Sequence, residues 1–139
     1  MKLITHVEVI LSLSLFLATF SIFFLFFISS QYSQAILIRE NKKIIKSIAI
    51  SQILIYSNHS YSLSTFNYTI LNSSKVSNFF NFCINNKQKI KNDFGVNEFL
   101  ILLNCRAIQY SCSTKNIKAQ IRRYVVLNNN ICYLDMGVE

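Results

Sequence analysis

The chain has 139 residues, of which 52% are hydrophobic, and a formal net charge of +8. This length leaves room for one small folded domain beside the apolar N-terminal stretch, and it excludes a protein of several domains. The sequence lacks a Gly-rich phosphate-binding loop and a recognisable pair of acidic residues at catalytic spacing. We therefore expect no enzymatic activity and no cofactor.

An apolar run of 20 residues without a charge, Gly or Pro covers residues 9–28, which we call the apolar segment. As a helix that rises about 1.5 Å per residue, it matches the roughly 30 Å hydrocarbon core of a bilayer. It is longer than the apolar region of a signal peptide, and the small residues Ser29 and Ser30 follow only after it. We predict an uncleaved membrane anchor over residues 1–30, with a cleaved signal sequence as the alternative.

The apolar periodicity continues beyond the anchor. Between residues 31 and 56 a stripe of apolar residues recurs at roughly helical spacing: Ala35, Ile38, Ile45, Ile48, Ala49 and Ile53. The pattern predicts that the helix continues to about residue 57. The stripe then needs a cover, either the chain's own domain or a neighbouring subunit. Because residues 47–56 are rich in β-branched side chains, a β-strand is the alternative there.

Residues 58–139 are expected to form one small α+β domain. Alternation of apolar and polar residues predicts a half-buried strand around residues 65–70, and a compact apolar run predicts a covered strand over residues 98–105. The polar stretch 85–93 indicates a loop or a short exposed helix. The expected architecture is a long N-terminal transmembrane helix that continues as an amphipathic helix and packs on a small antiparallel sheet ending in a C-terminal hairpin.

A C-terminal hairpin is the clearest local prediction. Two apolar runs are joined by Asn128, Asn129 and Asn130, and Asn tolerates the left-handed backbone that a three-residue hairpin loop demands. In the second arm, alternate residues share one side of the strand and are expected to face the core: Cys132, Leu134, Met136 and Val138.

The four cysteines all lie in the predicted domain, as a disulfide framework requires: Cys83, Cys105, Cys112 and Cys132. They permit three pairings, and the sequence does not choose among them. Their gaps of 22, 7 and 20 positions do not suit a structural zinc site, which usually carries closely spaced ligand pairs. Free buried thiols in a cytoplasmic domain are the remaining alternative.

Two further signals bear on membrane orientation, and they disagree. Glycosylation sequons, which are used outside the cytoplasm, begin at Asn58, Asn67 and Asn72. The positive-inside rule instead places the C-terminal side in the cytoplasm, because several basic residues follow the anchor: Arg39, Lys42, Lys43 and Lys46. Taking the cysteines into account, we expect a single-pass protein of the cell membrane whose C-terminal domain is extracytoplasmic.

The positive charge lies beyond the anchor, because residues 29–139 contain 13 Lys and Arg against 5 Asp and Glu. An anionic partner is therefore expected. One candidate is a phosphate-binding face formed by basic residues and nearby phenylalanines: Lys87, Lys89, Lys91, Arg122, Arg123, Phe79, Phe80 and Phe82. An ordinary solvated surface is the alternative. No specific nucleic-acid partner is predicted, since no nucleic-acid-binding motif is present.

Glu8 is a charge at the edge of the apolar segment. With Thr5 it fits a capping box, in which Thr5 caps the helix and Glu8 reaches back to the cap residue. This reading needs no function, and it requires that the helix begin at Thr5.

A second reading of Glu8 comes from resemblance. The stretch THVEVILSLSLFLATFSIFFLFF (residues 5–27), with a short basic N-terminus before it and a small domain after it, resembles the layout of type IV pilin-like proteins, including archaeal ones. The resemblance implies that the apolar helices pack into a filament or pseudopilus and that Glu8 contacts a neighbour's terminal amine. Leu3 stands where the family has Gly or Ala before its processing site.

The function expected from these observations is a membrane-anchored pilin-like or pseudopilin-like structural subunit, assembled through its N-terminal helix into a homo- or hetero-oligomer. The alternative is a solitary single-span protein whose basic cytoplasmic domain binds anionic lipid or nucleic acid.

Overall fold

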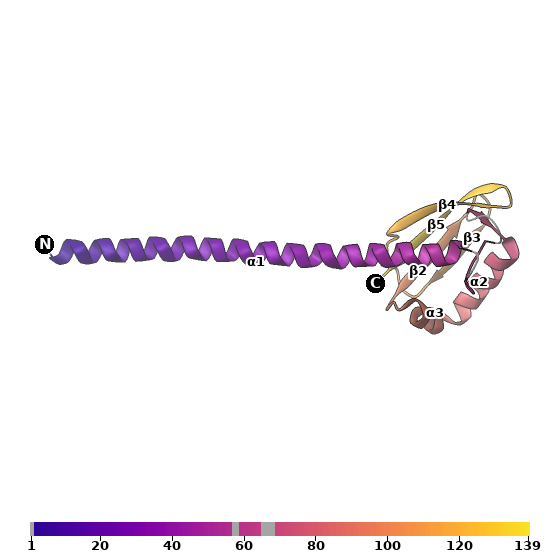
Figure 1. The fold of residues 1–139 in the computed structure, drawn as a ribbon, viewed down its shortest axis with the longest axis horizontal. Helices are drawn as coiled ribbons and strands as arrows, with labels where there is room; N and C mark the ends of the chain where they lie inside the picture. Colours follow the sequence, from indigo (N-terminus) through magenta and orange to yellow (C-terminus); the bar gives the residue numbers. More distant parts are fainter. Residues whose placement is uncertain (1, 57–58, 65–68) are drawn as a thin grey trace. The chain divides into compact units, whose positions relative to one another are not determined.

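The computed structural model describes residues 2–56, 59–64 and 69–139, with side chains from residue 7 onward. The chain divides into two units, residues 1–40 and residues 41–139, and we call the second unit the head. Helix α1 (Lys2–Ile55) forms the first unit and contributes its last turns to the head (Figure 1). The other elements are β1 (Ile70–Leu71), α2 (Ser73–Asn85), α3 (Lys87–Phe94), β2 (Phe99–Asn104), β3 (Gln109–Ser113), β4 (Ile121–Leu127) and β5 (Asn130–Val138).

The continuation of the helix is confirmed, and the alternative strand over residues 47–56 is wrong, because α1 runs to Ile55. The face that packs in the head differs from the predicted stripe, however. The buried positions are Ser47, Ile50, Ser51 and Leu54, whereas Ile45 is 64% exposed and Ala49 is also exposed.

Two of the buried positions on this face of α1 are serines rather than apolar residues. The apolar periodicity therefore predicted a different face of the helix. The Ser47 hydroxyl donates a hydrogen bond of 2.6 Å to Oε1 of Gln120, and the Ser51 hydroxyl donates one of 2.6 Å to the carbonyl of Ile48. With these partners the buried hydroxyls cost little, and their small side chains leave space for close packing.

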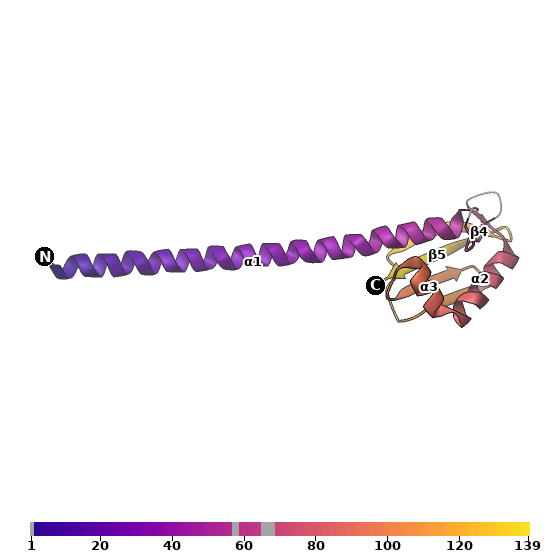
Figure 2. The same cartoon turned by 60° about the horizontal axis from the view of Figure 1, so that its bottom comes forward.

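The head contains one five-stranded sheet of order β1-β4-β5-β2-β3 (Figure 2). The pairs β4–β5, β5–β2 and β2–β3 are antiparallel, but β1 is parallel to β4. The sheet is therefore mixed, which corrects the antiparallel prediction. Strand β2 lies within the predicted strand 98–105. Residues 65–68 of the other predicted strand lie outside the described residues, and Ile70 begins the two-residue strand β1.

The C-terminal hairpin is confirmed, with a shorter loop than predicted. Asn128 and Asn129 have φ values of 51° and 62°, and Leu127 already pairs with Asn130. Two left-handed residues in succession are the signature of a type I′ turn, whose twist suits the flanking strands. Cys132, Leu134, Met136 and Val138 are all buried, as the alternation predicts.

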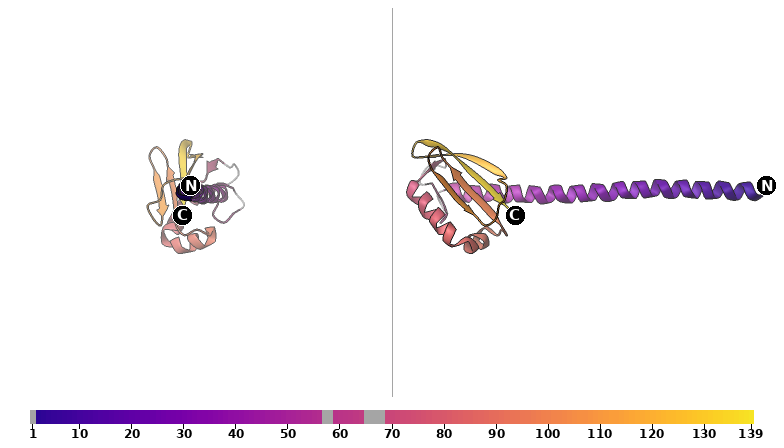
Figure 3. Two further views of the ribbon diagram at one scale, coloured as in Figure 1. Left: turned by 90° about the vertical axis from the view of Figure 1, so that its left-hand side faces the viewer. Right: turned by 180° about the vertical axis from the view of Figure 1, so that it is seen from behind.

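The buried side chains of the strands share one face of the sheet, which we call the inner face. Phe99, Ile101 and Leu103 of β2 lie there, opposite Val138, Met136 and Leu134 of β5. The head's helices supply the rest of this core. Figure 3 gives two further views of the sheet and helices within the head.

Helix α2 contributes Val76, Phe79, Phe80 and Cys83 to the core, although the sequence analysis does not predict it. Its start carries a recognisable signal, since Oδ1 of Asn72 accepts a hydrogen bond of 3.0 Å from the Lys75 amide. Helix α3 overlaps the polar stretch 85–93 and extends to Phe94, so the helix is confirmed over the alternative of a loop. It is not wholly exposed, because Ile90 is fully buried.

Candidate functional site

The apolar segment forms an uninterrupted part of α1, and its large side chains are exposed in the isolated chain. Over the part of the chain that the structure describes, α1 is the one helix long and apolar enough to cross a membrane, judged by length and composition. A signal sequence near the N-terminus would meet the same description.

The hydroxyl groups of the apolar segment are satisfied by the helix itself. Ser12 donates to the Val9 carbonyl at 3.0 Å and Ser14 to the Leu11 carbonyl at 2.8 Å. Thr19 and Ser21 likewise donate to carbonyls of the preceding turn, at 2.9 Å and 2.7 Å. Such bonds remove the need for outside partners, which a hydrocarbon environment would not provide.

Glu8 is exposed, and its carboxylate has no hydrogen bond or ion pair with any side chain described from residue 7 onward. Helix α1 begins at Lys2, so Thr5 lies inside the helix rather than at the boundary that a capping box requires. The Thr5 side chain lies outside the described residues. The role of Glu8 stays a prediction.

All four cysteines are paired, which confirms the disulfide framework and leaves no thiol free. Cys83 bonds Cys112, and Cys105 bonds Cys132. The two loops overlap along the chain, so the bridges are interleaved. The zinc and free-thiol alternatives are therefore wrong, and residue groups able to hold a metal ion are absent from the described parts of the chain.

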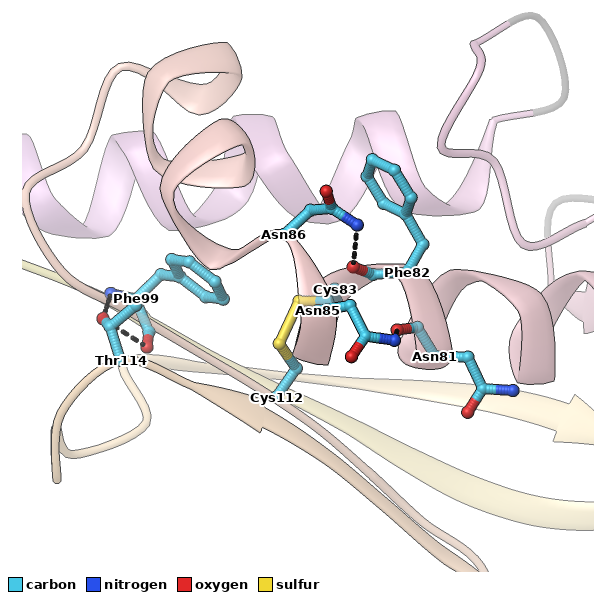
Figure 4. The surroundings of a disulfide bond; sticks show 8 residues. All are labelled: Asn81, Phe82, Cys83, Asn85, Asn86, Phe99, Cys112 and Thr114. Carbon is cyan, nitrogen blue, oxygen red and sulfur yellow. Dashed lines mark hydrogen bonds between the residues drawn. A yellow bond between two sulfur atoms is a disulfide. The ribbon is translucent and has the colours of Figure 1, made fainter.

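The two bridges tie different layers of the head. Cys83–Cys112 joins helix α2 to the edge strand β3, and nearby Asn86 donates from Nδ2 to the Phe82 carbonyl at the end of the helix (Figure 4). Cys105–Cys132 instead extends the β2–β5 ladder, because Asn104 pairs with Tyr133 and the next two residues face each other. Their Cα atoms are 4.4 Å apart, the spacing of a non-hydrogen-bonded antiparallel pair.

The structure describes one of the three predicted glycosylation sites. Asn58 and Asn67 lie outside the described residues. Asn72 is half-buried and uses its side-chain oxygen to cap α2. Its glycosylation stays a prediction.

The predicted phosphate-binding face does not form one surface. Phe79 and Phe80 are buried in the core, whereas Phe82 is half-buried and its ring centre lies 5.6 Å from Nζ of Lys89. Two of the basic residues are in ion pairs: Lys91 lies 3.5 Å from Glu98, and Arg122 lies 2.6 Å from Asp135. Lys87 and Lys89 are exposed on α3, and the remaining residue of the set, Arg123, lies on the inner side of β4. Phosphate binding by these residues stays a prediction.

A cleft of about 410 Å³ lies beside an aromatic cluster in the head, lined by His59, Ser60, Tyr61, Ser62, Lys75, Asn78, Phe79 and Phe82. Tyr61 is the centre of this cluster: its ring lies 6.1 Å from that of Phe79 and 5.6 Å from that of Phe94. Its hydroxyl donates to the Asp93 carboxylate. Burial, this hydrogen bond and the charge of Asp93 together raise the pKa of Tyr61 to about 12.

Comparison of the chain with family models, curated proteins and solved structures finds no match.

Loss of one disulfide should destabilise the head. We expect the double variant Cys83→Ala with Cys112→Ala to lose about 3 to 4 kcal/mol in the free energy of unfolding, because its 29-residue separation restricts the unfolded chain. Urea titration of the full chain in detergent, followed by tyrosine fluorescence, measures the change. Ser73→Ala on the exposed side of α2 is the control, and a loss below about 1 kcal/mol would contradict the expectation.

The raised pKa of Tyr61 predicts a loss of stability at alkaline pH. A folded pKa of about 12 above an ordinary value of 10.0 means that the contribution is complete below pH 10.0 and falls as the pH rises towards 12. Tyr61→Phe should flatten stability across this window, as measured by urea midpoints at successive pH values. Tyr124→Phe is the control, and an unchanged pH dependence in Tyr61→Phe would refute the assignment.

Proposed function

We propose that the protein is a membrane-anchored, pilin-like structural subunit whose head lies outside the cytoplasm. The observation that carries this proposal is the build of α1: one helix begins with an apolar segment of membrane-spanning length and ends in the core of a head that two disulfides close. This is the layout of a pilin-like subunit, in which a single helix serves both as anchor and as core element.

The disulfides support an extracytoplasmic head. Thiols are kept reduced in the cytoplasm of most organisms, whereas disulfides persist in oxidising compartments. The bridges involve every cysteine of the chain and connect four elements of the head. This signal outweighs the basic residues after the anchor, because those residues bias orientation without forbidding export of a small domain.

Assembly is supported by two features of α1. The apolar stripe that the sequence analysis assigns to the chain's own domain or to a neighbouring subunit stays largely outside the core, with Ile45 and Ala49 exposed. Glu8 carries a charge beside the apolar segment, where an acid is costly unless a positive group pairs with it. A terminal amine of a neighbouring subunit would supply that group.

The location of the head can be tested through its thiols. The bridges are buried in the folded head, so cells are lysed directly into denaturant that contains a maleimide, with and without prior reduction. We expect none of the four cysteines to be labelled without reduction and all four after it. Mass spectrometry of the full-length protein counts the labels, and a cytoplasmic thiol protein of the same cells is the control. Thiols that are labelled without reduction would favour the cytoplasmic alternative.

Assembly can be tested at Glu8. Ser14→Cys places a single free thiol in the apolar segment, so oxidation in the membrane should give disulfide-linked dimers of neighbouring subunits. Adding Glu8→Lys should lower the cross-linked fraction by about tenfold, a loss of about 1.4 kcal/mol, with unchanged membrane insertion. Glu40→Gln, an acid later in the same helix, is the control. Equal cross-linking in the two Glu8 backgrounds would sink the assembly role.

A further inference from the structure

The face of the sheet opposite the core, the outer face, carries a row of polar and aromatic residues. Direct pairing places Tyr124 of β4 beside Tyr133 of β5, Tyr133 beside Asn104 of β2, and Asn104 beside Gln109 of β3. With neighbouring strands about 4.8 Å apart, this row is about 14 Å long. It therefore offers an extended contact surface rather than a pocket for one small group.

One end of the outer face is covered and the other is open. At Gly137 an added Cβ atom would lie 2.4 Å from the Lys118 carbonyl oxygen, so the segment before β4 crosses the sheet there. Further along the same strands Tyr124 is 67% exposed and Ile131 is 68% exposed. The row of four residues lies on this open part.

The exposed tyrosines are held in place by a chain of contacts that starts at a buried acid. Asp135 is nearly buried and accepts two hydrogen bonds from Arg122, at 2.6 Å and 2.8 Å. The Arg122 guanidinium lies 5.1 Å from the centre of the Tyr133 ring, which in turn meets the Tyr124 ring edge to face at 5.2 Å. An aromatic surface fixed in advance loses little conformational entropy on binding.

The chemistry of the row suits a sugar polymer. An exposed tyrosine ring provides a flat apolar surface with a polar tip, which matches the apolar face and the hydroxyl rim of a pyranose. The amides of Asn104 and Gln109 each present donors and an acceptor side by side, as pairs of neighbouring hydroxyls require. Tyr133 already has Arg122 over its ring, so the row does not offer successive open rings of the kind that stack nucleic-acid bases.

The net charge of the head indicates which class of ligand the outer face would bind. Residues 41–139 contain 12 Lys and Arg against 4 Asp and Glu, a net charge of +8. Arg122 and Asp135 neutralise each other, so the attraction for an anion comes from the head as a whole. Two heads of this charge repel each other, which disfavours a second copy on the outer face, whereas a polyanion is attracted.

We infer that the outer face, centred on Tyr124 and Tyr133, is a binding surface for an acidic polysaccharide, a chain of sugars that carry carboxylates. This surface belongs to the head alone and does not depend on assembly through α1.

The experiment measures binding of the full chain in detergent to polygalacturonate, with neutral dextran as the uncharged comparison. We expect binding to polygalacturonate at low salt, at least tenfold weaker binding to dextran, and weakening as salt is added. Tyr124→Ala should reduce the affinity for polygalacturonate about tenfold, while Tyr124→Phe, which keeps the ring, should stay within about twofold.

Ile84→Ala is the matched control, because Ile84 is an exposed apolar residue on α2, the helix that Cys83–Cys112 ties to the inner face, and its truncation should leave affinity unchanged. Circular dichroism and urea midpoints establish that each variant is folded. Failure of the wild-type chain to bind polygalacturonate, or equal binding by Tyr124→Ala, would overturn the inference. Tighter binding to single-stranded oligothymidylate that depends on Tyr124 would overturn the inference and show that the outer face binds nucleic acid.

Discussion

The interleaved disulfides are the constraint on which the rest of the head depends. A small domain is only marginally stable, because the gain from apolar burial barely exceeds the loss of conformational entropy on folding. The bridges restrict the unfolded chain, and they do so across layers, since one joins α2 to β3 and the other joins the end of β2 to β5. Four elements of the head are held in this way.

Sequence patterns located the elements that carry strong local signals. The uninterrupted helix, strand β2 and the C-terminal hairpin all follow from periodicity and from the turn chemistry of Asn. The apolar periodicity did not predict which face of α1 is buried in the head, because that face includes Ser47 and Ser51, whose hydroxyls are hydrogen-bonded. The partner of Ser51 is local, but that of Ser47, Gln120, lies 73 residues further along the chain, and periodicity does not reveal it.

The same limit applies to the cysteines and to the candidate binding surface. The even number of cysteines indicated disulfides, but the pairing depends on how α2 and β3 meet, and α2 itself was not predicted. On β5, alternation placed Asp135 away from the core, yet it is nearly buried because Arg122 covers it from the neighbouring strand. A cross-strand ion pair requires the register of β4 and β5, which only the folded sheet defines.

The two faces of the sheet have different physical tasks, and this division restricts where partners can bind. Both disulfides and the head's helices use the inner face, so that its side chains are committed to stability. The outer face has no helix to cover it in the described head, and its open part is ordered by contacts that begin at Asp135 and end at Tyr124. A partner that binds there need not compete with the core, and a partner that binds the apolar segment need not alter the head. Anchoring and recognition can therefore vary independently in this protein.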